Sequence, residues 1–248
     1  MKKVFFILFT LVTLQVSAQT ANVVVRPDSL TTVVRSISTP KTEWLSPFSK
    51  VVVDGAIKIT FKRVETDEQL KIVYDTKGDS SSRFRAGVDK NGILQIIERT
   101  DLKPAVIPTE VTVYYKEFDN ISINHATATF EGVLECRLLD MVVKGGATVM
   151  INIKALDTLI ECTGKSRLKI GGECRYFSLA ISTAKMEGFG LKTVSSNIEA
   201  SHEAVVNISV SERLEAVTST SAKILYKGRP MIIRNLNTLF GGEILVVE

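Results

Sequence analysis

A unit of about nineteen residues is written six times between Phe118 and Pro230, and this repeat limits the possible folds more than any other feature. Each unit can be aligned on a small or polar residue that follows a short stretch of alternating apolar and polar residues. The aligned positions are separated by 20, 19, 19, 19 and 18 residues; they are Thr127, Ala147, Ser166, Lys185, Ala204 and Ala222. This spacing is too short for repeats built from helix pairs or propeller blades.

The stretch before each aligned position is expected to point two side chains inward, because successive residues of a strand face opposite sides. These inward pairs are Ile121 and Ile123, Met141 and Val143, Ile160 and Cys162, Leu179 and Ile181, Ile198 and Ala200, and Ala216 and Thr218. A second pair follows in most units: Val149 and Ile151, Leu168 and Ile170, Val206 and Ile208, and Ile224 and Tyr226. The fourth unit offers only Phe189, because Glu187 occupies the other position, and the first unit is out of phase at Phe130.

A period of two inside a period of about nineteen predicts short strands separated by corners. Helix is disfavoured, since Val, Ile and Thr are dense and no stripe of residues at i and i+4 persists. The simplest structure is a coil whose turns stack, bury a continuous column of inward side chains and pair their backbones. We therefore predict an all-β, single-stranded parallel β-helix, or β-solenoid.

The first eighteen residues have the features of a cleaved export signal. Lys2 and Lys3 precede the apolar run 4–14, and the small residues Ser17 and Ala18 suit a signal peptidase. The apolar run is too short for a comfortable membrane span, and no later stretch is apolar enough to hold the protein in a bilayer. The expected organisation is a signal peptide (1–18), an extended lead-in (19–43) and a solenoid domain (44–248). Within the solenoid domain we expect irregular first turns or a cap (44–117), regular repeats (118–230) and a C-terminal cap (231–248).

The charge balance argues against nucleic acid as a partner. Without the two lysines of the signal segment, 29 basic residues face 27 acidic ones, a surplus of two positive charges. A nucleic-acid or anionic-membrane protein is expected to carry a clustered basic face instead.

Three cysteines remain in the exported chain, so at least one is unpaired. The repeat places Cys136 and Cys174 in nearly one column but two turns apart, or roughly 9 to 10 Å, which is beyond the reach of a disulfide. Cys162 falls on a different wall. We predict three buried thiols that pack as small hydrophobes, with a disulfide or a metal site as alternatives.

The sequence resembles one known family. The strand pair Val-x-Val-Asp-Gly-Ala-Ile-x-Ile follows Phe48, small residues mark corners such as Gly145-Gly146-Ala147, and the repeats close with Tyr-Lys-Gly-Arg-Pro at 226–230. With the export signal, these features are similar to the putative auto-transporter adhesin, head GIN domain family of exported Bacteroidetes proteins. The resemblance extends over residues 44–248. It implies a right-handed parallel β-helix at the surface or in the periplasm, and it brings no catalytic residues.

The search for reactive groups finds no convincing site. His125 and His202 share a corner of the coil but lie four turns apart, roughly 19 Å, so they are too distant to share a metal. Glu161 and Glu199 take the same outward position two turns apart, near the carboxylate spacing of an inverting glycosidase. The residue between them is Ala180, and no Asp cluster or Arg base joins them, so solvated glutamates are the preferred interpretation.

The aromatic and basic residues of the repeats do not predict a binding site either. Tyr176, Phe177 and Phe189 are expected to pack in the core or at corners rather than to form a sugar platform. Lys144, Lys165, Lys185 and Lys223 fall near corners, where a solvated face is expected more than a basic ridge.

The sequence thus predicts an exported, non-enzymatic β-solenoid of a Gram-negative cell envelope, periplasmic or on the cell surface. We assign it no catalytic, cofactor-binding or metal-binding residues, and its expected partner is an envelope protein or glycan. The alternatives are a carbohydrate-active β-helix enzyme, either a polysaccharide lyase or a hydrolase, and a structural envelope component without a soluble ligand.

Overall fold

The computed structural model describes residues 39–65, 67–77, 83–99 and 107–248. The predicted signal segment 1–18 and lead-in residues 19–38 lie outside the described residues. The sixteen strands are β1 (Lys41–Trp44), β2 (Lys50–Asp54), β3 (Ile57–Arg63), β4 (Lys71–Asp75), β5 (Phe84–Val88), β6 (Ile93–Glu98), β7 (Thr109–Tyr115), β8 (Asn120–Asn124), β9 (Thr127–Lys144), β10 (Thr148–Cys162), β11 (Arg167–Ser182), β12 (Lys185–Ser201), β13 (Val205–Ser219), β14 (Lys223–Lys227), β15 (Ile232–Leu239) and β16 (Glu243–Val246). The described part of the chain contains no helix.

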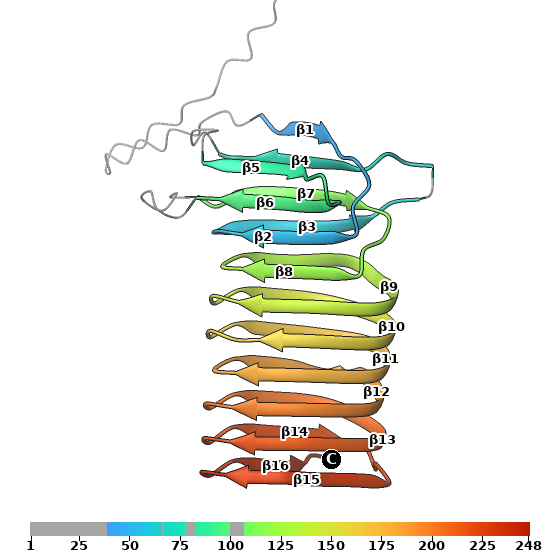
Figure 1. Ribbon diagram of the computed structural model, residues 1–248, viewed down its shortest axis with the longest axis vertical. Coiled ribbons are helices and arrows are strands. Elements are labelled where there is room, and N and C mark those ends of the chain that lie inside the picture. The colour runs from blue at the N-terminus through green and yellow to red at the C-terminus, as the bar shows by residue number, and fades with distance from the viewer. Residues whose placement is uncertain (1–38, 66, 78–82, 100–106) are drawn as a thin grey trace, which may run out of the picture. The chain divides into compact units, whose positions relative to one another are not determined.

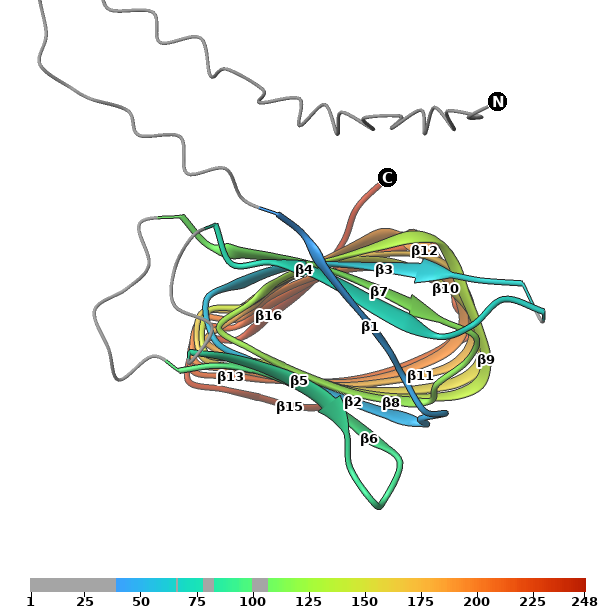
Figure 2. The same ribbon diagram turned by 90° about the horizontal axis from the view of Figure 1, so that it is seen from above.

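The strands form a right-handed β-solenoid of about six turns of roughly 19 residues, as predicted (Figure 1). We call each turn a rung. From β9 to β13 a single long strand runs along one wall, bends, and returns along the other wall, so that Figure 2 shows a flattened ring seen end-on. Successive rungs pair in parallel register, for example Ile160 with both Met141 and Leu179.

Two walls and two kinds of turn describe each rung. The first wall consists of residues 120–124 and the segments that stack on them, 140–144, 159–162, 178–182, 197–201 and 215–219. A sharp corner leads to the second wall, which begins at Thr127 and its equivalents. A wide bend, at residues 155–157 in β10, then leads to the first wall of the next rung. The walls face each other across the core.

The predicted inward pairs of the first wall are confirmed as stacked columns. Ile121, Met141, Ile160, Leu179, Ile198 and Ala216 lie in one continuous register, and all are buried. The second column begins with Ile123 and Val143 and ends with Thr218, again entirely buried. Burial of each large aliphatic side chain contributes about 1.5–3 kcal/mol, so these columns hold the rungs together.

The predicted alignment is wrong by one residue in two units. The buried column of small residues at the start of the second wall is Ala126, Ala147, Ser166, Ala184, Ala204 and Ala222, whereas Thr127 and Lys185 are exposed. The inward pairs of these units shift accordingly. The first unit contributes Ala128 and Phe130, and the fourth contributes Met186 and Gly188 in place of Phe189.

The error arises because the sharp corners have two lengths. Two residues with positive φ make most corners, as at Gly145-Gly146 and His202-Glu203, and the N–H of the following alanine donates to the carbonyl oxygen three residues earlier. This is the pattern of a tight turn with two left-handed residues. At His125 and Thr183 a single left-handed residue makes the corner. The corners before Ala126 and Ala184 are therefore one residue shorter than the others. An alignment at nearly constant spacing places the start of the second wall one residue too late in both units, at Thr127 and Lys185.

Several of these corners carry residues that disfavour a left-handed backbone, and Thr220 (φ 51°) is a β-branched example. We expect Thr220→Gly to raise the free energy of unfolding by about 0.5–1 kcal/mol, because the removed Cβ relieves more strain than the added chain entropy costs. The matched control is Thr148→Gly inside β10, which should lower it by about 1 kcal/mol. Urea denaturation of both variants measures the effect, and two changes of the same sign would contradict this account.

The rungs at the N-terminal end do not stack in the order of the sequence. β2 pairs in parallel with β6 on one side and β8 on the other, and β3 lies likewise between β7 and β9. Figure 1 shows this as a blue rung between two green ones. The β2–β3 rung thus comes first in the sequence, and β6 and β7, which follow, lie on its outer side. Residues 116–119 then lead the chain back to its inner side.

Five aromatic rings fill the core where the chain makes this return. Phe61 stacks on Phe130 with ring centroids 4.5 Å apart, and it also approaches Phe118 (5.9 Å) and Tyr115 (6.3 Å). Phe48 joins the cluster through Phe118. All five side chains are buried, so aromatic rings fill the core between the β2–β3 rung, its two neighbours and the link at 116–119.

Antiparallel strands cover the N-terminal end of the coil. β4 pairs antiparallel with β7, β1 pairs with β4, and β5 forms a hairpin with β6 through the turn at 89–92. Residues 41–43, which the sequence analysis assigned to the lead-in, belong to β1. These additions protect an edge that would otherwise expose unpaired backbone groups.

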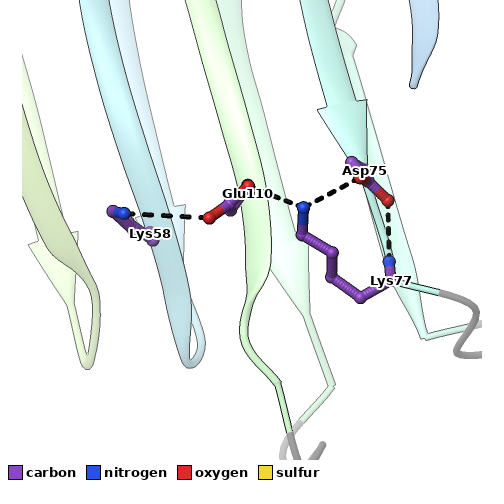
Figure 3. A network of polar contacts seen from close by, with 4 residues as sticks. All are labelled: Lys58, Asp75, Lys77 and Glu110. Carbon is purple, nitrogen blue, oxygen red and sulfur yellow. Dashed lines mark hydrogen bonds and ion pairs between the residues drawn. The ribbon is translucent and has the colours of Figure 1, made fainter. Parts of the chain in front are cut away.

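A network of charged side chains ties β4 to β3 and β7 (Figure 3). Lys77 Nζ lies 2.9 Å from Asp75 and 2.7 Å from Glu110, and Lys58 lies 3.7 Å from Glu110. The hydrogen bond to Glu110 raises the pKa of Lys77, and the same contact lowers the pKa of Glu110. The network thus stabilises this end at neutral pH, and its contribution is lost as pH falls through the lowered pKa of Glu110 or rises through the raised pKa of Lys77.

The C-terminal residues form one further rung. β15 pairs in parallel with β13, and β16 pairs in parallel with β14. Residues 231–248, for which a cap is predicted, form this last rung, and the pairing of β15 with β13 shifts register between Ala216 and Val217. Met231 and Phe240 are exposed there.

Candidate functional site

The outward glutamates stack as the repeat predicted. Glu161 pairs with Ala180, and Ala180 pairs with Glu199, so the two carboxylates occupy one column two rungs apart. They border a shallow hollow of about 430 Å³ on the first wall, together with Asp140 and hydroxyl side chains. Both glutamates are exposed, whereas the general acid of a glycosidase pair usually sits in an apolar pocket. We call this surface the acidic hollow.

The two histidines lie at sharp corners four rungs apart. His125 Nδ1 is 3.7 Å from Asp54, and the imidazole of His202 contacts the hydroxyls of Ser182 and Ser201 at 3.2 and 3.1 Å. Over the described residues, no group of three or more His, Cys, Asp or Glu side chains is arranged to hold a metal ion.

The three thiols occupy the positions that the repeat predicted. Ala155 pairs with both Cys136 and Cys174, so these two cysteines share a column with one rung between them. Cys162 and Cys174 are buried as predicted, whereas Cys136 is only half-buried, and all three cysteines are free. Burial raises the pKa of Cys136 to about 11 and that of Cys162 to about 12, and it also raises the pKa of Cys174.

We expect these thiols to react slowly with a disulfide reagent at pH 8, because only the thiolate is nucleophilic and all three pKa values lie above their usual range. A colourimetric titration should give three thiols in guanidinium chloride and less than about one in native protein over several minutes. Reactivity should rise with pH. Rapid native modification of Cys162 would contradict its place in the core.

The predicted aromatic and basic candidates do not converge on one another. Phe177 is buried as expected, Phe189 is half-buried under Lys227 (5.1 Å), and Tyr176 is exposed beside Arg175 (5.5 Å). The four lysines do not form one column, since Lys144 precedes its corner and Lys165 lies within one. Only Lys185 and Lys223 share a column, with Val205 between them. Lys223 forms an ion pair with Glu243 at 3.0 Å.

A groove with a volume of about 970 Å³ lies along the wide bend. Its first rim is the stacked column Lys154, Glu173, Lys192, Ser209 and Lys227. Its second rim, two or three residues further along each rung, includes Arg175, Val194, Glu212 and Arg229. Because both rims follow the stacking direction, the groove runs parallel to the axis of the coil. We call it the axial groove.

Small side chains make the floor of the axial groove. The floor column is Ala155, Cys174, Thr193 and Val210, followed by Gly228. Hydrogen bonds fix it in place: Cys174 donates to Thr158 Oγ1 (3.2 Å), Thr193 donates to the Ser209 carbonyl (2.8 Å), and Ser211 donates to the Thr193 carbonyl (3.1 Å). The groove is therefore built on a rigid base.

The sequence analysis did not identify this groove. Its residues come from five successive rungs, and they fall at the wide bend, where the alternating pattern is interrupted. The signal was present in the spacing, since Lys154, Glu173 and Lys192 are each nineteen residues apart. Of the floor residues, the sequence pattern assigns only Cys174, as a buried small hydrophobe.

Residues 47–230 match the family described as putative auto-transporter adhesin, head GIN domain. The chain belongs to this family. Membership in the head GIN domain family rests on most of the solenoid, from β2 to the end of β14. A search of the curated proteins gave no match.

Solved structures similar to this head GIN domain chain share its fold at low sequence identity. A putative adhesin from Bacteroides fragilis NCTC 9343 is 17% identical, with a TM-score of 0.76, covering 86% of this chain and 99% of that one. A putative adhesin from Parabacteroides distasonis ATCC 8503 is 16% identical, with a TM-score of 0.67 and coverage of 85% and 97%. A putative lipid binding protein from the same organism is 14% identical, with a TM-score of 0.54 and coverage of 85% and 97%.

Among the residues described, no helix is long and apolar enough to cross a membrane. The family supports an adhesin-like or binding β-solenoid, and the solved structures support the fold.

Proposed function

We propose that this protein is an exported, non-enzymatic adhesin-like module that binds a protein or glycan of the cell envelope through a surface that runs along its coil. The observation that carries the proposal is the combination of a regular buried core with an axial groove on a rigid floor. Function on such a scaffold must be argued from a site, and the groove is a concave surface with charged rims and a floor of small residues. The adhesin family supports a binding role.

Export to the periplasm or the cell surface is part of the proposal. The motive is the charged start, apolar run and small residues of the first eighteen positions. Fractionation of cells that express the full chain would test it. Recovery of the protein in the cytoplasm with its first eighteen residues intact would refute export.

Binding is tested by incubating the immobilised protein with a panel of purified envelope glycans and with envelope extract. We expect saturable capture of at least one defined component, which purified component and purified protein then reproduce. Capture of nothing from either source would favour a structural envelope component without a soluble ligand.

The absence of catalysis is tested on the same glycans, with and without calcium. We expect no new reducing ends or unsaturated products. Turnover that Glu161→Gln or Glu199→Gln abolishes would instead favour a carbohydrate-active enzyme, because these exposed carboxylates share one column.

A further inference from the structure

We propose that the axial groove binds an anionic polysaccharide chain, one that carries carboxylate or sulfate groups. This inference rests on the proposed function and names the chemical class of the ligand. It is argued from the direction of the groove, its charge and the groups beside it.

The groove suits a chain-like ligand because of its direction. Its rim column passes through five rungs, from Lys154 in β10 to Lys227 in β14. At about 4.8 Å between neighbouring rungs, four intervals extend roughly 19 Å along the coil. The groove is open along this length, so an extended polymer can lie in it without its ends being enclosed.

The groove suits an anion because of its charge. Lys154, Lys192, Lys227, Arg175 and Arg229 line it, against only Glu173 and Glu212, which leaves a surplus of three positive charges. The whole chain after residue 18 has 29 basic and 27 acidic residues, a surplus of two. The rest of the chain is therefore slightly acidic, and the groove concentrates the positive charge in one concave strip where it attracts anions most strongly.

The remaining groups match a hydroxylated polymer better than a bare polyanion. Glu173 and Glu212 interrupt the cations and can accept hydrogen bonds from sugar hydroxyls. Tyr176 lies beside the groove and is 46% exposed, with the guanidinium of the rim residue Arg175 over its ring (5.5 Å), so its remaining exposed ring surface can contact a sugar ring. The cations then bind carboxylate or sulfate groups at intervals along the chain.

The test measures binding of the purified full chain to polygalacturonate and heparin, with neutral dextran as the comparison, by titration calorimetry at low salt. We expect binding to one or both polyanions and none to dextran. The Arg175→Glu, Lys192→Glu double variant should weaken polyanion binding by roughly tenfold or more, because it replaces two contacting cations with repelling anions. The difference between the carboxylated and sulfated probes identifies the preferred anion.

The matched control is the Lys169→Glu, Lys185→Glu double variant. Both lysines are exposed on the second wall outside the groove, and the change in net charge is the same. We expect this control to bind within about threefold of the parent protein. Equal weakening in both double variants would mean that net charge alone attracts the polymer, and it would overturn the inference.

Two other results would also overturn it. No binding to either polyanion would exclude the proposed ligand class, while the envelope module would stand if a neutral glycan or defined protein is still captured. The second result is self-association in sedimentation that the Arg175→Glu, Lys192→Glu double variant abolishes. It would mean that the groove binds a second copy of the protein, for example its acidic hollow.

Discussion

Gly172→Ala is expected to lower the free energy of unfolding by about 3–5 kcal/mol, a large effect for a single methyl group. Gly172 has a φ of 101°, which L side chains rarely adopt. It pairs with Ile153 on one side and Leu191 on the other, and both neighbours are fully buried. A Cβ at position 172 would overlap the carbonyl oxygen of Ile153 and lie 3.0 Å from its backbone N and carbonyl C. The rungs would have to separate to accommodate it.

The matched control is Gly87→Ala in β5. A Cβ there meets nothing within 4 Å, and its φ is not positive. This variant is expected to change stability by no more than about 0.5 kcal/mol. Chemical denaturation followed by circular dichroism compares the two, and equal stability of both variants would show that the close approach at Gly172 is not required.

Phe61→Ala is expected to cost about 3–5 kcal/mol, because it removes a fully buried ring from the centre of the aromatic cluster. Phe61 contacts the rings of Phe130, Phe118 and Tyr115, which come from the two rungs beside its own and from the returning link. The cavity would lie in the core beside the link at 116–119. Thermal and urea denaturation should both show the loss.

Two controls separate this volume effect from a general sensitivity to aromatic replacement. Phe240→Ala removes a ring that is 80% exposed and should change stability by about 0.5 kcal/mol or less. Tyr115→Phe keeps the ring and removes a buried hydroxyl that has no hydrogen-bond partner, so its stability should be equal or higher. If Phe61→Ala lowered the free energy of unfolding no more than Phe240→Ala does, the aromatic cluster would not be what stabilises the β2–β3 rung.

The core of the repeats could be predicted because burial follows the pleat of the strand. Alternation places Ile121 and Ile123 on one face whatever the exact corner, and the near-constant spacing places Met141 and Val143 over them. The one-residue errors at Thr127 and Lys185 have a physical origin. Corners with one or two left-handed residues reverse the chain equally well, and only pairing between rungs reveals which is used.

Other parts of the fold could not be predicted from local pattern. The pairing of Lys50 with both Ile93 and Asn120 joins segments far apart in sequence. The residue pattern of each strand is equally compatible with other stacking orders. The axial groove is equally hidden, because Cys174 and Thr193 look like core residues until the rims on both sides are placed. The predicted absence of catalytic, metal and cofactor residues stays a prediction.

The position of the β2–β3 rung between two later ones sets a condition on how the molecule can be made. Synthesis delivers residues 50–63 first, yet their backbone partners lie at 93–97, 109–115, 120–124 and 127–131. A nascent chain that ends before these residues offers residues 50–63 no strand to pair with. Pairing across such long loops also has an entropy cost of loop closure that arises before the pairing stabilises the chain. Assembly is therefore expected to nucleate in the consecutive rungs nearer the C-terminus and to capture the earliest segment late.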